Sequence, residues 1–279
     1  MRIGSYGVGW VAGVIAAGLC GASASAQTPS PFTHWQNAAG VVLAPLGGPV
    51  PEWRITAGGG AAFIPRYEGS NHYRLEPAPA FDIRWRDIAF LSSGDGLGVN
   101  ILRGDTYRAG IAVGYDLGRD QHLAGRLNGI GNVDAAPEAR LFADIALLPF
   151  VLDFNIRRAI GGHDGVVGDF GAYLPVVGTQ ELVVFVGPSV TFGNRRYMQA
   201  YFGISTAQAM GSNAHFPVYR AGAGLKSYGV GADAIYHITE RLFIDTDIAL
   251  ERLADSAGNS PIVQDRNQLG LSVILGYEF

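Results

Sequence analysis

The chain has 279 residues, a formal net charge of −4 at pH 7 and one cysteine. Without a basic excess, nothing points to binding of nucleic acid through its phosphates, and a lone cysteine excludes an internal disulfide. Forty glycines against three methionines argue against a helical bundle. Apolar residues make up 48% of the chain, yet beyond Gln27 no uncharged apolar run approaches the length of a membrane-spanning helix. Hydrophobicity spread this evenly is typical of a membrane β-barrel.

Residues 1–26 have the features of a cleaved signal peptide. Arg2 precedes an apolar stretch that ends at Leu19, and the small residues that follow lead to Ala24-Ser25-Ala26, which satisfies the A-x-A cleavage rule. The apolar stretch is shorter than the ~20 residues that a membrane-spanning helix needs. Cys20 follows a leucine instead of a small residue, which argues against lipid attachment there. We therefore expect residues 1–26 to direct export and to be removed.

Residues 27–52 form an irregular lead-in that we expect to lie in the periplasm. Five prolines, at positions 29, 31, 45, 49 and 51, favour turns over regular structure. Alternation typical of β-strands begins at Trp53. We therefore expect a single barrel domain over residues 53–279.

From Trp53 onward, apolar and polar residues alternate in most strand-like stretches. In the stretch 106–117, Tyr107, Ile111 and Val113 share one face, and Arg108 and Asp116 share the other. The expected strands are 53–64, 78–86, 88–93, 96–102, 106–117, 139–148, 150–159, 166–174, 181–192, 196–205, 228–238, 242–252 and 268–279. Because bacterial single-chain barrels have an even number of strands, we expect about twelve after some short stretches merge.

A soluble β-sandwich also has strands of period two, so the alternation alone does not identify a membrane barrel. Three features favour the barrel. The apolar faces carry aromatic residues at strand ends, as in interfacial belts: Trp53, Trp85, Tyr107, Tyr236 and Tyr277. The opposite faces combine glycine and alanine with charges of both signs, as a narrow lumen requires. The signal peptide supplies the route to the cell envelope.

The last stretch, Asn267–Phe279, keeps an apolar face to its final residue. Leu269, Leu271, Val273, Leu275, Tyr277 and Phe279 lie on that face. A closing barrel strand ends in this way, with its aromatic residue at the membrane interface. We expect Phe279 to be recognised by the barrel assembly machinery.

The connections between strands predict which end of the barrel faces outward. Tight turns are expected at 237–241 and 192–195, whereas the longer polar connections at 118–138, 206–217 and 253–267 are candidates for the outer face. If the last strand ends in the periplasm, 239–241 is periplasmic and 253–267 is extracellular.

Three stretches carry a resemblance to one family, the MipA/OmpV outer-membrane proteins. Ile64-Pro65-Arg66-Tyr67-Glu68-Gly69-Ser70 resembles the family's P-x-Y-x-G-S signature. Tyr201–Ser205, followed by Gln208-Ala209, resembles its YFGV segment. Arg252–Val263 resembles its RL-x-x-D-A-A-x-S-P-I/V loop and departs from it at Ser256, Gly258 and Asn259. The residues themselves indicate structural roles: Gly69 permits a turn, Pro261 stiffens a loop, and Tyr67 is expected near a membrane interface.

The resemblance implies an all-β transmembrane barrel in the outer membrane of a Gram-negative bacterium, without catalysis of its own. The family's name comes from a scaffold that interacts with a murein lytic transglycosylase and helps to bring it to a penicillin-binding protein. The resemblance does not decide the role, and a scaffold of this kind, in contact with outer-membrane lipid, is the first function that we expect. Two other functions stay open: a narrow passive pore for small solutes, and a surface adhesin or antigen that acts through the loops 206–217 and 253–267.

Tests for an enzyme lead to no catalytic, cofactor-binding or metal residue. None of the six histidines is followed two places later by a serine, the spacing that outer-membrane lipid hydrolases place on one strand. Asp245 and Asp247 share one face, but at i and i+2 they lie about 7 Å apart along a strand, too far to share a proton. We expect them to be balanced by Arg84, Arg108 or Arg157. His163-Asp164 lies in a glycine-rich loop without further ligands at metal-binding spacing.

Overall fold

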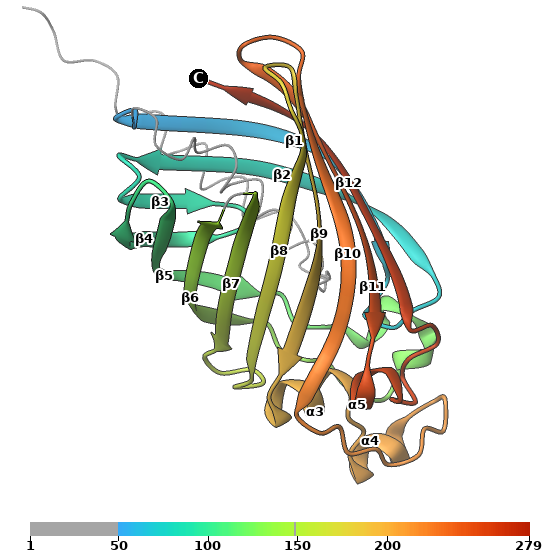
Figure 1. The fold of residues 1–279 in the computed structure, drawn as a ribbon. Helices are drawn as coiled ribbons and strands as arrows, with labels where there is room; N and C mark the ends of the chain where they lie inside the picture. The colour runs from blue at the N-terminus through green and yellow to red at the C-terminus, as the bar shows by residue number, and fades with distance from the viewer. Residues whose placement is uncertain (1–49, 148) are drawn as a thin grey trace, which may run out of the picture.

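The structure, a computed structural model that describes residues 50–147 and 149–279, is a closed antiparallel β-barrel of twelve strands (Figure 1). Each strand pairs with its neighbours in the sequence, and the first strand pairs with the last. The predicted fold class and strand number are therefore confirmed. The expected signal peptide, residues 1–26, and the lead-in up to residue 49 lie outside the described residues.

The strands are β1 (Trp53–Pro65), β2 (Tyr73–Trp85), β3 (Ala89–Ser92), β4 (Gly96–Arg103), β5 (Tyr107–Asp116), β6 (Ala136–Leu147), β7 (Phe150–Ala159), β8 (Val166–Gly178), β9 (Leu182–Gly193), β10 (Gly224–His237), β11 (Leu242–Leu253) and β12 (Asn267–Glu278). The helical segments are η1 (Gln121–Leu123), η2 (Gly125–Leu127), α3 (Arg195–Phe202), α4 (Thr206–Gly211) and α5 (Asp255–Gly258). None of the helices in the described residues has the length and apolar composition needed to cross a bilayer.

The two ends of the barrel differ in the length of their connections. Short turns, such as 238–241, lie at the end where β12 finishes, and the helical segments of the described residues lie at the opposite end (Figure 1). Outer-membrane barrels have short periplasmic turns and longer extracellular loops. The end that carries η1, η2 and α3–α5 is therefore the extracellular end, as expected for the connections 118–138, 206–217 and 253–267.

The alternation along each strand sorts the side chains between the outside and the lumen. In β12, Leu275 is 50% exposed on the outer face, whereas its neighbour Ile274 is 6% exposed inside. In β7, Phe154 and Ile156 face outward, and Asp153 and Asn155 are buried in the lumen. The predicted assignment of apolar faces to the outside is confirmed in these strands. Aromatic side chains, such as Phe90 and Phe142, also fill part of the lumen.

One expected strand, 196–205, is wrong. The residues Arg195–Phe202 form α3, and the tight turn expected at 192–195 is the start of this helix. Asn194 caps it, because its side chain accepts a hydrogen bond from the backbone N–H of Tyr197 at 3.0 Å. The buried residues Tyr197, Met198, Tyr201 and Phe202 follow helical spacing and pack toward the barrel.

The barrel wall is not equally tall all the way round. β3 has four residues, and β2 pairs with it only over Asp82–Trp85, although β2 pairs with β1 along its whole length. On the other side, the ladder between β4 and β5 reaches no further than Val113. The hairpin of β3 and β4 is therefore confined to the periplasmic half of the wall (Figure 1).

Candidate functional site

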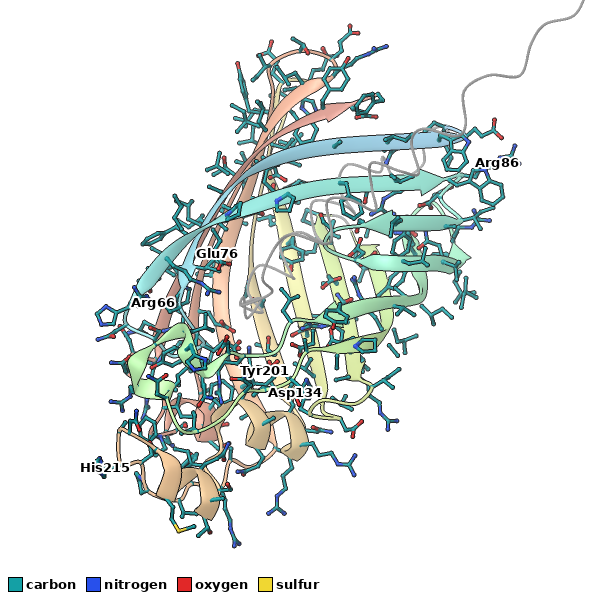
Figure 2. The ribbon with its side chains drawn as sticks, turned by 180° about the vertical axis from the view of Figure 1, so that it is seen from behind. Arg66, Glu76, Arg86, Asp134, Tyr201 and His215 are labelled. Carbon is teal, nitrogen blue, oxygen red and sulfur yellow. The ribbon has the colours of Figure 1, made fainter. Side chains whose placement is uncertain are left out.

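The extracellular end of the barrel is closed by a packed cap, which we define as the connections 66–72, 117–135, 194–223 and 254–266. Figure 2 shows these segments gathered at one end of the barrel, with Tyr201 between them and the lumen. Side chains from these connections and from the strand ends next to them form two apolar clusters. The first contains Tyr67, Leu127, Ile130, Ile204, Phe216 and Ile262; the second contains Val133, Val167, Tyr197, Met198, Tyr201, Phe202, Ala221, Leu253 and Ala257. The cap thus has a hydrophobic core of its own.

Tyr67 anchors the connection between β1 and β2 to the connection between β11 and β12. Its hydroxyl donates to the Ile262 carbonyl at 3.1 Å and lies 2.9 Å from Gln264 Oε1. The side chain is 1% exposed. The sequence predicted that Tyr67 lies near the membrane interface, and this prediction is wrong. The turn after Pro65 directs the side chain into the cap. Burial raises the pKa of Tyr67 to about 12.

Gly69 makes the turn that brings these two connections together. Its φ of +93° is in the left-handed region, and a Cβ there would lie 2.6 Å from the Val263 side chain. Its backbone N–H donates to Gln268 Oε1 at 3.0 Å, and its carbonyl accepts from the N–H of Gln264 at 2.7 Å. The predicted role of Gly69 in a turn is confirmed.

The two other motifs meet the first one in the same cap. Ser260 donates from Oγ to the Phe202 carbonyl at 2.6 Å, which joins the connection before β12 to the end of α3. Ile204 forms a bridge with Tyr219, and the Tyr219 hydroxyl donates to the Ser256 carbonyl at 2.8 Å. The three segments that resemble family signatures are therefore parts of one structure.

A buried ion cluster lies next to the cap, at the extracellular end of the lumen. Lys226 is fully buried, and its Nζ lies 2.6 Å from Glu68 Oε1 and 3.7 Å from Glu251 Oε1. The lysine comes from β10, Glu251 from β11 and Glu68 from the connection after β1. One cation thus holds two strands and the cap together.

His163 joins the connection between β7 and β8 to the cap. Its Nδ1 accepts from the N–H of Gly165 at 2.9 Å, so the ring proton is on Nε2, which lies 2.9 Å from Asp116 Oδ2. The Tyr201 hydroxyl donates to the other carboxylate oxygen of Asp116 at 2.7 Å. Because both ring nitrogens of His163 make hydrogen bonds, we interpret this residue as one that holds the β7–β8 connection in place.

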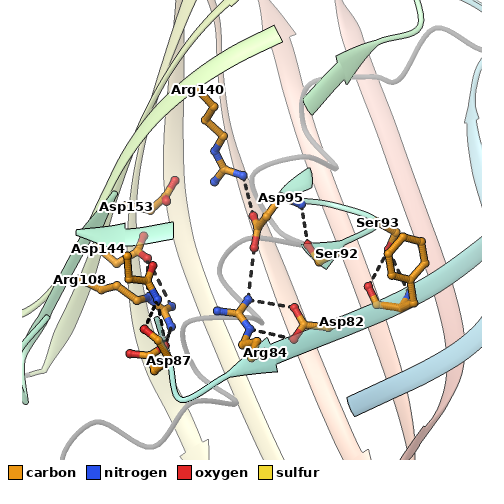
Figure 3. A network of polar contacts seen from close by, with 12 residues as sticks. Asp82, Arg84, Asp87, Ser92, Ser93, Asp95, Arg108, Arg140, Asp144 and Asp153 are labelled. Carbon is orange, nitrogen blue, oxygen red and sulfur yellow. Dashed lines mark hydrogen bonds and ion pairs between the residues drawn. The ribbon is translucent and has the colours of Figure 1, made fainter. Parts of the chain in front are cut away.

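Nearer the periplasmic end of the lumen, a chain of ion pairs joins the β3–β4 turn to β2 on one side and to β6 on the other (Figure 3). Arg84 makes a bidentate contact with Asp82, at 2.8 and 3.0 Å, and reaches Asp95 at 3.3 Å. Asp95 also accepts from Arg140 at 2.6 Å. Such charge-assisted pairs fix the turn inside the lumen and narrow the passage.

The arginines expected to balance Asp245 and Asp247 are engaged elsewhere. Arg84 pairs with Asp82 and Asp95, Arg108 with Asp87 and Asp144, and Arg157 with Asp169 and Glu138. Asp245 and Asp247 instead converge on Asp233 of β10, with one carboxylate oxygen of each within 4.8 Å of the others. The expected balance is wrong, because the arginines lie on other strands of the wall.

The group of Asp233, Asp245 and Asp247 is the set of described residues that could hold a metal ion. The side chains turn toward one another, so the expected separation of about 7 Å between Asp245 and Asp247 overestimates the distance between their oxygens. Ser272 donates to Asp247 at 2.7 Å. Three carboxylates offer the oxygen ligands that Ca²⁺ or Mg²⁺ takes, with water needed to complete the shell.

Several of these residues could not be recognised from the sequence. Asp233 follows an ordinary alternation in GVGADAIYH, and only the register of β10 against β11 places it opposite Asp247. Lys226 precedes the stretch predicted as a strand. Glu68 lies inside a motif, but nothing in the motif indicates a partner 158 residues away.

Comparisons with known proteins give one consistent result. The family model described as MltA-interacting protein MipA matches residues 57–279. The outer membrane protein OmpV of Vibrio cholerae is 29% identical over 184 residues, which cover 64% of this chain and 67% of OmpV. Omp26La of Vibrio anguillarum is 29% identical over 178 residues, which cover 62% of this chain and 65% of that protein. The aligned region thus spans about two thirds of each relative.

Among solved structures, the NanC porin resembles the chain with a TM-score of 0.41 and 10% sequence identity. The match covers 81% of this chain and all of that porin. A similarity of this size supports no argument about solutes or mechanism.

Proposed function

The chain belongs to the MipA family of outer-membrane β-barrel proteins, and from this we propose that it is a non-catalytic scaffold for peptidoglycan-remodelling enzymes. The first proposed partner is a murein lytic transglycosylase, because the family description names an interaction with MltA. The second proposed partner is a penicillin-binding protein. The observation that carries the proposal is the closure of the barrel by its cap. A barrel whose extracellular end is covered by packed connections is better suited to present a surface than to conduct solutes.

The surface available to a periplasmic partner is formed by the short turns. Arg86 and Glu52 pair at 2.7 Å with more than half of each side chain exposed, and Arg241 lies in the turn between β10 and β11. The aromatic belt at this end, with Trp53 57% and Phe279 71% exposed, holds the turns at the membrane interface. Exposed charges above such a belt are accessible to a partner anchored in the same membrane.

Charge reversal at these turns tests the scaffold. We expect Arg86→Glu with Arg241→Glu to lower recovery of a lytic transglycosylase with the purified full-length barrel at least tenfold. The matched control is Arg195→Glu with Arg196→Glu, at the exposed extracellular start of α3. The heat-dependent shift of the barrel on a gel checks folding of both variants. Equal recovery with both variants, or none with the wild type, would contradict the proposal.

The same purified barrel distinguishes a scaffold from a passive pore. In planar bilayers, a scaffold gives no steady ion-selective openings. Openings that disappear when Asp245 and Asp247 are changed to asparagine would favour a pore.

Adhesion would have to act through exposed cap residues such as Met210, which is 80% exposed on α4. Ile262, in contrast, is fully buried within the other loop expected to adhere.

A further inference from the structure

We propose that the barrel has a lateral portal between β2 and β5, through which the chain of a single-chain zwitterionic amphiphile passes from the membrane into the lumen. The proposal goes beyond the scaffold function and does not depend on it. It rests on the closed mouth, the incomplete wall, the prolines of β2, and a pocket that begins at the edge of the opening.

Within residues 50–147 and 149–279, packed side chains of the cap cover the extracellular mouth of the lumen. Phe202, Ile204 and Leu127 are each fully buried in the cap. The ion cluster of Lys226, Glu68 and Glu251 lies directly beneath them. A molecule that reaches the lumen from the outer half of the membrane must therefore come through the wall.

The wall has such an opening in its extracellular half. Within the described residues, Tyr73–Ala80 of β2 pair with β1 on one side and with no strand on the other. These eight residues extend about 26 Å along the strand at the usual rise, and less along the membrane normal because barrel strands are tilted. Figure 2 shows β2 and β5 on either side of this region, with the β3–β4 hairpin at one end of it.

The sequence of β2 is adapted to an unpaired edge. The Phe81 carbonyl accepts from the N–H of Ser93, so the backbone groups of Phe81 point toward β3. Residues two and four places earlier point the same way, and these are Pro79 and Pro77. Proline has no N–H to donate, and within sheets it is confined to edges. The sequence of β2 therefore lacks backbone N–H donors at the positions where a neighbouring strand would need them.

A membrane-exposed edge is tolerated only where water or protein reaches its backbone groups. The pocket behind the periplasmic end of this edge, at Ala80 and Phe81, gives such access. A pocket lined by Phe81 and Ser93 at the rim continues inward to Phe243, Ile274 and Gly276. On the β5 side, a Cβ added to Gly114 would meet no atom within 4 Å. The pocket therefore reaches the wall at the periplasmic end of the opening, next to Ala80, and free space also lies beside Gly114 on the β5 side.

The lining of the pocket indicates what it accepts. Apolar groups come from Ala80, Phe243 and Ile274, and charges of both signs come from residues that include Arg54 and Asp245. Leu75 is 72% and Leu97 61% exposed beside the opening, on the lipid-facing side. A molecule that leaves lipid past such residues carries a hydrocarbon chain. A head group with both charges fits the mixed polar lining.

Photo-crosslinking in lipid nanodiscs tests the portal. The probe is a lysophosphatidylethanolamine with a diazirine in its 16-carbon chain, used with the full-length barrel. We expect crosslinks to the lumen-facing residues Phe243 and Ile274 that excess unlabelled lysophosphatidylethanolamine removes. Crosslinks to the outer face, which report bulk lipid, should not be competed. Peptide mass spectrometry separates the two sets.

Two bulky variants and one control decide the route. Gly114→Trp places a side chain in the free space at the rim, and Ala78→Trp does so from β2 if the first variant fails to fold. We expect either to lower the lumen crosslinks at least tenfold. The control is Gly59→Trp on the outer face of β1, where an added Cβ also meets no atom within 4 Å; it should leave them unchanged. Lumen crosslinks that are absent from the wild type, not competed, or retained in both variants would overturn the proposal.

Discussion

At the scale of single residues, a few side chains connect parts of the chain that are far apart in sequence. Tyr67 bonds to the Ile262 carbonyl across 195 positions, and Lys226 to Glu68 across 158. Neither contact could be predicted, because each depends on which loops meet above the barrel. The turn at Gly69 could be predicted, since glycine tolerates the left-handed backbone that the turn needs.

Lys226 should be the side chain whose loss costs the most stability at this end of the barrel. Lys226→Met leaves Glu68 and Glu251 buried without their cation, and we expect a loss of about 3–5 kcal/mol in the free energy of unfolding. Denaturant unfolding in detergent, followed by tryptophan fluorescence, measures the change. The control Arg66→Met alters an exposed cation of the same end and should shift the midpoint little. Equal midpoints for the two variants would contradict a structural role for the cluster.

At the scale of elements, strands were easier to predict than helices. Alternation located β1, β7 and β11 to within a residue or so, because one face of each strand must be apolar against lipid. The stretch 196–205 also contains regularly spaced aromatic residues, and there the same reasoning failed. A cap at Asn194 and apolar residues in adjacent pairs indicate a helix, but eight residues provide too few turns for the helical period to stand out.

The N-terminal cap of α3 gives a direct test of this local structure. Asn194→Ala removes the acceptor for the N–H of Tyr197, and we expect a loss of ~1 kcal/mol in cap stability. Proteolysis of the connection 194–223 under native conditions reports the change as faster cleavage. Arg195→Ala, one residue further and exposed, is the matched control. A cleavage rate for Asn194→Ala that equals the control's would show that the cap does not hold the helix.

At the scale of the whole molecule, the sequence predicted the barrel, its strand number and the longest connections, but neither the cap nor the pattern of charges in the lumen. The first three follow from one-dimensional regularities: period two, loop length and the apolar end of β12. The position of Asp233 beside Asp245 and Asp247 depends on strand register, and the cap depends on how four connections pack. Both are long-range properties, which no short window of sequence contains.

The tyrosines of the cap make its closure sensitive to alkali. Burial raises the pKa of Tyr67 to about 12 and raises the pKa of Tyr197 and Tyr201 well above the ordinary value of 10.0. The folded cap keeps these protons at a pH where the unfolded chain loses them. Its stability is therefore complete below pH 10 and falls as the pH rises from 10 toward about 12.

Trypsin cleavage of the cap connections between pH 8 and 11.5, corrected for the activity of the protease on an unfolded substrate, measures this loss. We expect protection to decrease above pH 10 while the barrel strands stay intact on the gel. Tyr67→Phe has no proton to lose at that position, and it should show a shallower decrease. Protection that is constant up to pH 11.5 would show that the phenols do not control the closure.

The junction between the first and last strands is the place where the chain closes on itself, and it contains the run Gly58-Gly59-Gly60 in β1. Glycines bring little side-chain packing to a seam and lose much freedom when it forms. The hydrogen bonds from Tyr67 to the Ile262 carbonyl and from Gly69 to Gln268 of β12 hold the extracellular end of this junction together. Because these hydrogen bonds join residues near both ends of the folded domain, they can form only after the β11–β12 hairpin has reached β1. An assembling chain would therefore lack these hydrogen bonds, which distinguish the folded barrel from its precursors, until its last strand is in place.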